Sequence, residues 1–69
     1  MIYFKGNIMK RENRKLFEDV DGTNLVWDVE DGTEEVYFEY EDGERDMLWN
    51  GASYKKAESV YQKTLEYMQ

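Results

Sequence analysis

Carboxylates are the only side chains in this 69-residue sequence that are dense enough to do chemistry together. Residues 18–46 hold thirteen of them against a single cation, Arg45. The thirteen are Glu18, Asp19, Asp21, Asp28, Glu30, Asp31, Glu34, Glu35, Glu39, Glu41, Asp42, Glu44 and Asp46. A group of acids has three common uses in proteins, which are acid–base catalysis, binding of divalent cations and attraction of a basic partner.

The composition argues against catalysis. The sequence has no histidine, so the commonest general base is missing and no serine or threonine has a histidine to activate it. Two carboxylates can act as acid and base, but the reaction also needs a concave pocket and a raised pKa, which so small a fold rarely encloses. We therefore expect a protein that is not an enzyme and has no catalytic residues.

Calcium is the metal to consider, because Asp-Gly dipeptides occur in calcium-binding loops. With Gly22 at loop position six of an EF-hand, Asp19 and Asp21 would take positions three and five. Position one is then Phe17, however, and position twelve is Asp28 where a glutamate is required. The absence of cysteine also removes thiolate sites. We expect no metal site and no cofactor.

Three Asp-Gly dipeptides divide the acidic stretch into segments that alternate between apolar and polar residues. They lie at 21–22, 31–32 and 42–43, and the alternating segments are 25–30, 35–41 and 47–49. Alternation with a period of two is typical of strands, and Asp-Gly between two such runs is typical of hairpin turns. The pattern predicts an antiparallel β-meander of about four to five strands.

The N-terminal residues allow two interpretations. Residues 2–9 fit a tight hairpin with Gly6-Asn7 at its turn. Residues 8–17 also fit a helix, because apolar residues at 8–9 and 16–17 recur two helical turns apart. Whether residues 8–17 form strand, loop or helix is left open by the pattern.

The C-terminal residues predict one amphipathic helix. Ser53 is the expected N-cap, because its hydroxyl can accept a hydrogen bond from an unpaired backbone amide. The apolar face of the helix consists of Ala57, Val60, Tyr61, Thr64, Leu65 and Met68. The helix needs an apolar surface to cover, and the meander offers one. We expect a single α+β domain over residues 1–69, with the helix packed across one face of the sheet.

An acidic sheet face follows from this arrangement. If the helix covers the face bearing Trp27, Val29, Val36, Phe38 and Tyr40, the opposite face carries Asp28, Glu30, Glu35, Glu39, Glu41 and Asp46. Tyr37 would then emerge between Glu35 and Glu39. Carboxylates two residues apart on a strand lie about 6.6 Å apart, and neighbouring strands lie about 4.8 Å apart. The acids would form a regular negative array, comparable with the phosphates of duplex DNA.

The candidate partner-binding residues are Asp28, Glu30, Glu35, Tyr37, Glu39, Glu41, Asp42, Glu44 and Asp46. An alternative interpretation is that the acids only keep the surface soluble and that Tyr37 covers its cross-strand neighbours. Like charges opposed on adjacent strands destabilise a sheet, so a merely soluble surface would contain lysines among the acids. None occurs between Lys15 and Lys55, which favours the functional interpretation.

Charge is unevenly distributed along the chain. Residues 1–15 carry a net charge of +4, residues 16–46 carry −12 and residues 47–69 carry +1, which sum to −7. Nucleic acids and anionic membranes are polyanions, so we expect the protein to bind neither directly. The basic residues Lys10, Arg11, Arg14 and Lys15 are more typical of an internal counter-patch, or of a second contact to a protein partner, than of a nucleic-acid site. The expected partner is a basic protein.

The N-terminus lacks a secretory signal, and no apolar stretch is long enough to span a membrane. We therefore expect a cytoplasmic protein. Proline is absent, so the edge strands lack a common guard against pairing with another chain. Either a monomer or a homodimer is compatible with the sequence.

In size, acidity, lack of cysteine and β-rich pattern, the chain resembles the DNA-mimic inhibitors encoded by phages and plasmids. That class includes anti-CRISPR proteins, anti-restriction proteins and inhibitors of uracil-DNA glycosylase. The resemblance is carried by residues 18–46 and includes no family motif, so no residue role is transferred. It implies an inhibitor that blocks the basic groove of a nucleic-acid-handling defence or repair protein in the host cell cytoplasm. The alternative is a non-catalytic interaction or assembly module that uses a sheet edge.

Overall fold

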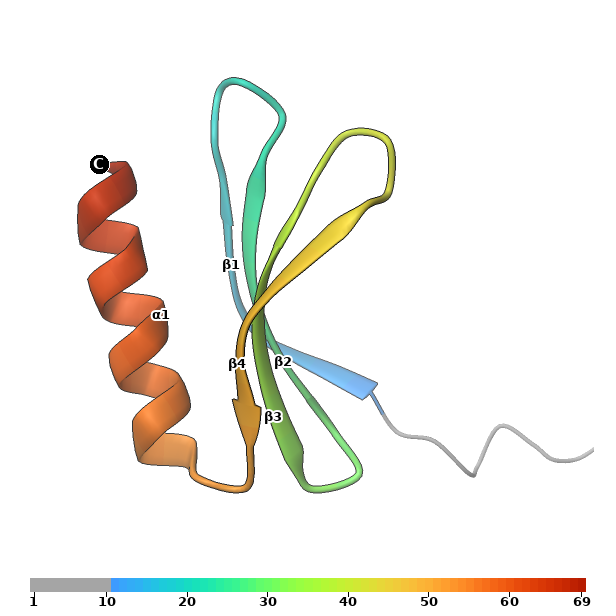
Figure 1. The fold of residues 1–69 in the computed structure, drawn as a ribbon, viewed down its shortest axis with the longest axis vertical. Coiled ribbons are helices and arrows are strands. Elements are labelled where there is room, and N and C mark those ends of the chain that lie inside the picture. Colours follow the sequence, from blue (N-terminus) through green and yellow to red (C-terminus); the bar gives the residue numbers. More distant parts are fainter. Residues whose placement is uncertain (1–10) are drawn as a thin grey trace, which may run out of the picture.

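Four strands follow one another across a sheet, and a C-terminal helix lies against one face, in the computed structural model, which describes residues 11–69 (Figure 1). The elements are β1 (Arg11–Glu18), β2 (Asn24–Glu30), β3 (Thr33–Glu39), β4 (Arg45–Gly51) and α1 (Tyr54–Met68). Each strand pairs antiparallel with the next, in the order β1-β2-β3-β4. The predicted α+β meander with one C-terminal helix is confirmed. The hairpin predicted over residues 2–9 lies outside the described residues.

Glycine sets the geometry of each hairpin. Asp31 and Gly32 both have positive φ (54° and 82°) between the paired residues Glu30 and Thr33, as a two-residue primed turn requires. The other two hairpins share a different design with a single positive-φ glycine, Gly22 or Gly43. In each of them the backbone amide of this glycine donates to the carbonyl three residues earlier. This pattern is typical of three-residue hairpin loops that end in a left-handed residue.

The polar stretch after residue 10 is a strand and not a helix. Residues 11–18 form β1, so the helical interpretation of residues 8–17 is wrong for the part that the structure describes. The strand is almost wholly exposed, which explains why its sequence has no apolar period. Its stability comes from pairing with β2 and from contacts between its arginines and acids on neighbouring strands.

The core lies between the sheet and α1. Its fully buried residues are Leu25, Trp27, Val36, Ala57 and Tyr61, and Phe17, Phe38, Trp49, Val60, Leu65 and Met68 pack against them. Trp27 is the centre, because its ring lies 5.0 Å from the ring of Tyr54 and 5.9 Å from that of Tyr61. The apolar face predicted for the helix is therefore the face that packs, and it covers the sheet face that bears Trp27, Val36 and Phe38.

Both edge strands contain a β-bulge. The pairing of β1 with β2 shifts between Asn13 and Lys15, so Arg14 is the extra residue. The pairing of β3 with β4 shifts in the same way, and Leu48 is the extra residue between Met47 and Trp49. A bulge reverses the side-chain alternation beyond it and bends the strand. The regular alternation expected over residues 47–49 is therefore interrupted.

The start of α1 is fixed by Ser53. Its Oγ accepts a hydrogen bond from the backbone amide of Lys56 at 3.1 Å, as predicted for an N-cap. Replacing Ser53 with alanine should lower the free energy of unfolding by about 1 kcal/mol, because that amide loses its partner. The matched control is Ser59→Ala on the exposed face of the same helix, which should leave the stability unchanged or slightly raised. Urea denaturation of the two variants measures the difference, and equal stabilities would contradict the assignment of the cap.

Candidate protein-binding surface

Two carboxylates are buried within the described part of the chain, and they lie on opposite faces of the sheet. Asp28 and Glu34 are each only 5% exposed. Each receives an arginine from β1, Arg11 for Asp28 and Arg14 for Glu34. Buried charges are costly unless they are paired and hydrogen-bonded. Asp28 and Glu34 therefore need their arginines and are not free to bind another molecule.

Asp28 has three hydrogen-bond donors on the sheet face away from α1. Its Oδ2 accepts from the Arg11 guanidinium at 2.8 Å and from the Tyr37 hydroxyl at 2.7 Å, and its Oδ1 accepts from the Asn13 amide at 2.9 Å. Burial alone would raise the pKa of Asp28, but the hydrogen bonds from Asn13, Tyr37 and Arg11 outweigh burial and hold this pKa below its ordinary value. The carboxylate is therefore ionised and fully occupied within the fold.

Glu34 is held on the helix-covered face. Arg14 donates to both of its oxygens, from Nε at 2.8 Å and from NH2 at 2.9 Å, and Trp27 donates from Nε1 at 2.9 Å. The Arg14 hydrogen bonds are the main reason that the pKa of Glu34 lies below its ordinary value. The Arg14 guanidinium also lies 4.8 Å from the centre of the Tyr54 ring. The sequence-based set of candidate residues did not include Glu34.

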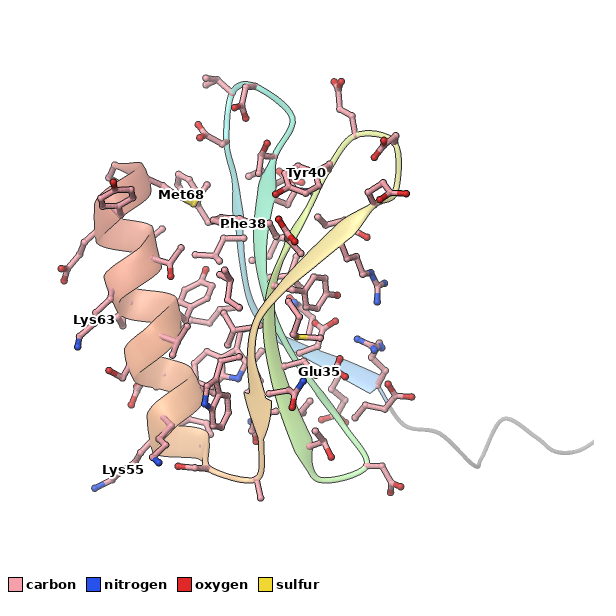
Figure 2. All side chains as sticks on the ribbon, viewed as in Figure 1. Glu35, Phe38, Tyr40, Lys55, Lys63 and Met68 are labelled. Carbon is pink, nitrogen blue, oxygen red and sulfur yellow. The ribbon has the colours of Figure 1, made fainter. Side chains whose placement is uncertain are left out.

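Several acids of the predicted acidic face contact arginines within the molecule. Arg11 contacts Glu30 and Glu35 as well as Asp28, at 2.8 and 2.9 Å, and Arg45 lies 3.8 Å from Glu39. Figure 2 shows Glu35 on the side of the sheet away from the helix and Phe38 on the helix side. The acids are thus on the predicted face, but they form ion pairs and not a bare negative array.

Tyr37 is buried, so the prediction that its side chain emerges between Glu35 and Glu39 is wrong. Its side chain is 3% exposed, its hydroxyl donates to Asp28, and the Arg45 guanidinium lies 4.8 Å from the centre of its ring. Burial and the hydrogen bond to Asp28 raise the pKa of Tyr37 to about 12. The alternative interpretation, in which Tyr37 covers its cross-strand neighbours, is the one that the structure shows.

Asp46 lies on the helix side of the sheet, contrary to its expected place among the acids of the opposite face. It pairs with Phe38, and its Oδ2 accepts a hydrogen bond from the Tyr40 hydroxyl at 3.0 Å. The physical reason is the bulge at Leu48, which shifts the alternation of β4 by one residue. A single sequence gives little warning of such a bulge.

Most of the exposed acids of residues 18–46 gather at one end of the sheet, and Asp31 is exposed in the turn at the other end. The hairpin loops between β1 and β2 and between β3 and β4 lie side by side at the same end (Figure 1). A side-chain carbon added at Gly22 would lie 2.6 Å from Cγ of Glu41, so the two loops are in contact. We call this end the acidic tip, and its carboxylates are Glu18, Asp19, Asp21, Glu41, Asp42, Glu44 and Asp46. All seven are exposed except Asp19, which is half-buried.

The two loops of the acidic tip are fixed by the same local hydrogen bond. Asp21 Oδ1 accepts from the amide of Thr23, and Asp42 Oδ1 accepts from the amide of Glu44, both at 3.0 Å. A depression of about 300 Å³ lies between the loops and is lined by Asp21, Thr23, Tyr40, Glu41 and Asp42. The loops therefore present their charges on a defined backbone.

The acidic tip brings together four of the nine predicted site residues, Glu41, Asp42, Glu44 and Asp46, with three that were not predicted as site residues, Glu18, Asp19 and Asp21. The signal for the second group was present in the turn spacing. In an antiparallel meander the first and third turns lie at the same end of the sheet. The acids on either side of Gly22 and Gly43 are therefore expected to lie close together at that end.

The two arginines of β1 serve as an internal counter-patch. Arg11 and Arg14 are both engaged by carboxylates of the sheet, as one of the sequence interpretations proposed, while Lys10 lies outside the described residues. Within residues 11–69 no group of three or more acidic, histidine or cysteine side chains is arranged to hold a metal ion. In the same residues no helix is long and apolar enough to cross a membrane.

Comparison with protein-family models, with curated proteins and with solved structures finds no match to this chain. The features that bear on function are the acidic tip and the ion pairs of the sheet.

Removal of the Tyr37 hydroxyl tests the buried network. Tyr37→Phe should lower the free energy of unfolding by about 2 kcal/mol, because Asp28 loses one of its donors to a buried charge. Tyr40→Phe is the matched control, since its hydroxyl bonds the exposed Asp46 and its loss should hardly change the stability. Urea denaturation measures both variants. An equal effect of the two substitutions would argue that Asp28 is not stabilised by Tyr37.

Acid should destabilise the fold through the same two carboxylates. The pKa values of Asp28 and Glu34 lie below the ordinary 3.8 and 4.5 in the folded protein, so the unfolded chain takes up protons first as the pH falls. Their stabilising contribution is fully present above the ordinary values and is lost as the pH falls through the folded values. Unfolding free energies measured from neutral to acid pH should fall less steeply for an Asp28→Asn, Glu34→Gln double variant. An unchanged slope would assign the acid sensitivity to other groups.

Proposed function

We propose that this chain is a small protein-binding inhibitor that blocks the basic nucleic-acid groove of a DNA- or RNA-handling defence or repair protein by imitating the charge of nucleic acid. The observation that carries the proposal is the acidic tip, where seven carboxylates from two hairpins gather at one end of the sheet. Such an arrangement fits an inhibitor encoded by a phage or another mobile element and acting in the host cytoplasm. The proposal includes no catalytic step.

The distribution of ion pairs supports the tip as the binding surface. Asp28, Glu30 and Glu35 share the single positive charge of Arg11, so these three acids already have a contact within the fold. The acids of the tip have Arg45 as the single cation in their part of the sequence, residues 16–46, and its guanidinium lies over Tyr37 on the sheet. The charge that attracts a basic protein is therefore concentrated at the tip.

Steric and electrostatic blockade follows from this geometry. The principal dimensions, 44 × 28 × 15 Å, describe a flat, elongated molecule, and the acidic tip lies at one end of it. A basic groove would attract this end over a distance of about a Debye length, roughly 8–10 Å at physiological salt. Once the tip is seated, nucleic acid cannot enter the groove. Binding should weaken steeply with salt, because the attraction is between charges.

The first test is capture from a bacterial lysate on the immobilised full chain, with elution in a rising salt gradient. We expect a basic nucleic-acid-binding protein to elute late and to be displaced by added duplex DNA. Retention of basic proteins that DNA does not displace, or the absence of any basic protein, would overturn the proposal.

Charge reversal at the tip tests the surface itself. Glu41→Lys with Glu44→Lys should reduce retention of the captured protein at least about tenfold, since several contacts to basic side chains would turn repulsive. The matched control is Glu12→Lys with Glu58→Lys, two exposed acids outside the tip, which change the net charge equally. If the two double variants lose the same affinity, net charge and not the tip determines binding.

A further inference from the structure

A row of apolar side chains crosses the sheet face opposite α1. Leu16 pairs with Val26, Val26 with Tyr37, and Tyr37 with Met47. The row faces away from the helix, because it alternates with core residues such as Trp27. Its middle is filled, since Val26 and Tyr37 are buried, but its two ends are open, with Leu16 50% and Met47 47% exposed. Apolar side chains are thus exposed at both edges of one face.

Each open end of the row has a charge beside it, and the two charges are opposite. The next row towards the acidic tip pairs Glu18 with Asn24, Asn24 with Glu39, and Glu39 with Arg45. Glu18 therefore lies beside Leu16 on β1, and Arg45 lies beside Met47 on β4. Both charged residues are exposed. The two edges of this face are complementary to each other.

The edges themselves do not suit pairing with another strand. The bulge at Arg14 interrupts β1 and the bulge at Leu48 interrupts β4. Bulges on edge strands disrupt the regular ladder that an added strand would need. Association through the sheet face is therefore favoured over association through its edges.

We propose that this face is the interface between two copies of the chain, packed face to face about a two-fold axis parallel to the strands. In that arrangement β1 of one copy lies over β4 of the other. Leu16 packs against Met47 of the second copy, and Glu18 faces Arg45 of the second copy. Each contact occurs twice, as the symmetry of an isologous dimer requires.

The contact between Glu18 and Arg45 of the second copy distinguishes this axis from the alternative. A two-fold axis along the apolar row would place Leu16 on Leu16 of the second copy and would move Glu18 away from Arg45. With the axis parallel to the strands, the two acidic tips lie at the same end and repel each other. Added salt screens this repulsion, so the dimer should strengthen with salt, whereas binding of a basic partner at the tip should weaken. The two proposals can therefore fail independently.

Sedimentation velocity of the full chain over a wide concentration range, at moderate salt, tests the dimer. We expect a monomer–dimer equilibrium that Met47→Ser weakens roughly tenfold, because each dimer loses two apolar contacts. Val20→Ser is the control, because Val20 is a fully exposed apolar residue in the loop between β1 and β2 and lies outside the row. A monomer at every concentration would overturn the proposal, as would equal effects of the two substitutions.

A charge exchange tests the axis. Glu18→Arg and Arg45→Glu should each weaken the dimer several-fold, and the double variant should recover association relative to Arg45→Glu, since the pair between copies is restored with reversed signs while the contacts of Arg45 to Glu39 and Tyr37 of its own copy stay lost. Circular dichroism reports whether each variant keeps the fold. Failure of the double variant to recover, with the fold intact, would overturn the proposed arrangement.

Discussion

Two arginines of one exposed edge strand stabilise the two buried carboxylates on which the sheet depends. Arg11 and Arg14 lie three residues apart, and the bulge between Asn13 and Lys15 includes Arg14. One guanidinium can therefore reach Asp28 on the open face while the other reaches Glu34 on the helix-covered face. Without them, two ionised groups would be buried inside a chain that has little apolar area to offset the cost.

These ion pairs also decide which part of the negative charge faces outward. The sequence is acidic throughout residues 18–46. In the central sheet, however, Glu30, Glu34, Glu35 and Glu39 form ion pairs with Arg11, Arg14 or Arg45. The carboxylates that could contact another molecule lie in the acidic tip. In that part of the sequence no lysine or arginine occurs except Arg45. Outside the seven acids of the acidic tip the chain has nine acids and nine cations, so its net charge of −7 equals the charge of the tip.

The sequence was sufficient for the fold and insufficient for the exact surface. Asp-Gly turns, alternation along β2 and β3, the cap at Ser53 and the apolar face of α1 are local signals, and local signals determined the architecture. Three features depend on contacts between distant residues and could not be read in advance. These are the strand formed by the polar residues 11–18, the burial of Tyr37, and the bulge that moves Asp46 to the other face.

Burial of Tyr37 illustrates why the candidate site shifted. Alternation along β3 correctly places Tyr37 on the face that bears Glu35 and Glu39. Alternation does not show, however, which groups cover a side chain on that face. The covering group is the Arg45 guanidinium, and its position depends on the bulge in β4. An error of one residue in register therefore turned an expected binding anchor into a structural residue.

The two loops of the acidic tip repeat one backbone design, with a single left-handed glycine and one aspartate that caps its own turn. The other residues of these two loops make no contribution to the core between the sheet and α1. Their side chains can therefore diverge rapidly while the framework stays unchanged. A protein built in this way can follow an evolving partner by altering a few loop positions, because adaptation at the tip and stability of the sheet are determined by different residues.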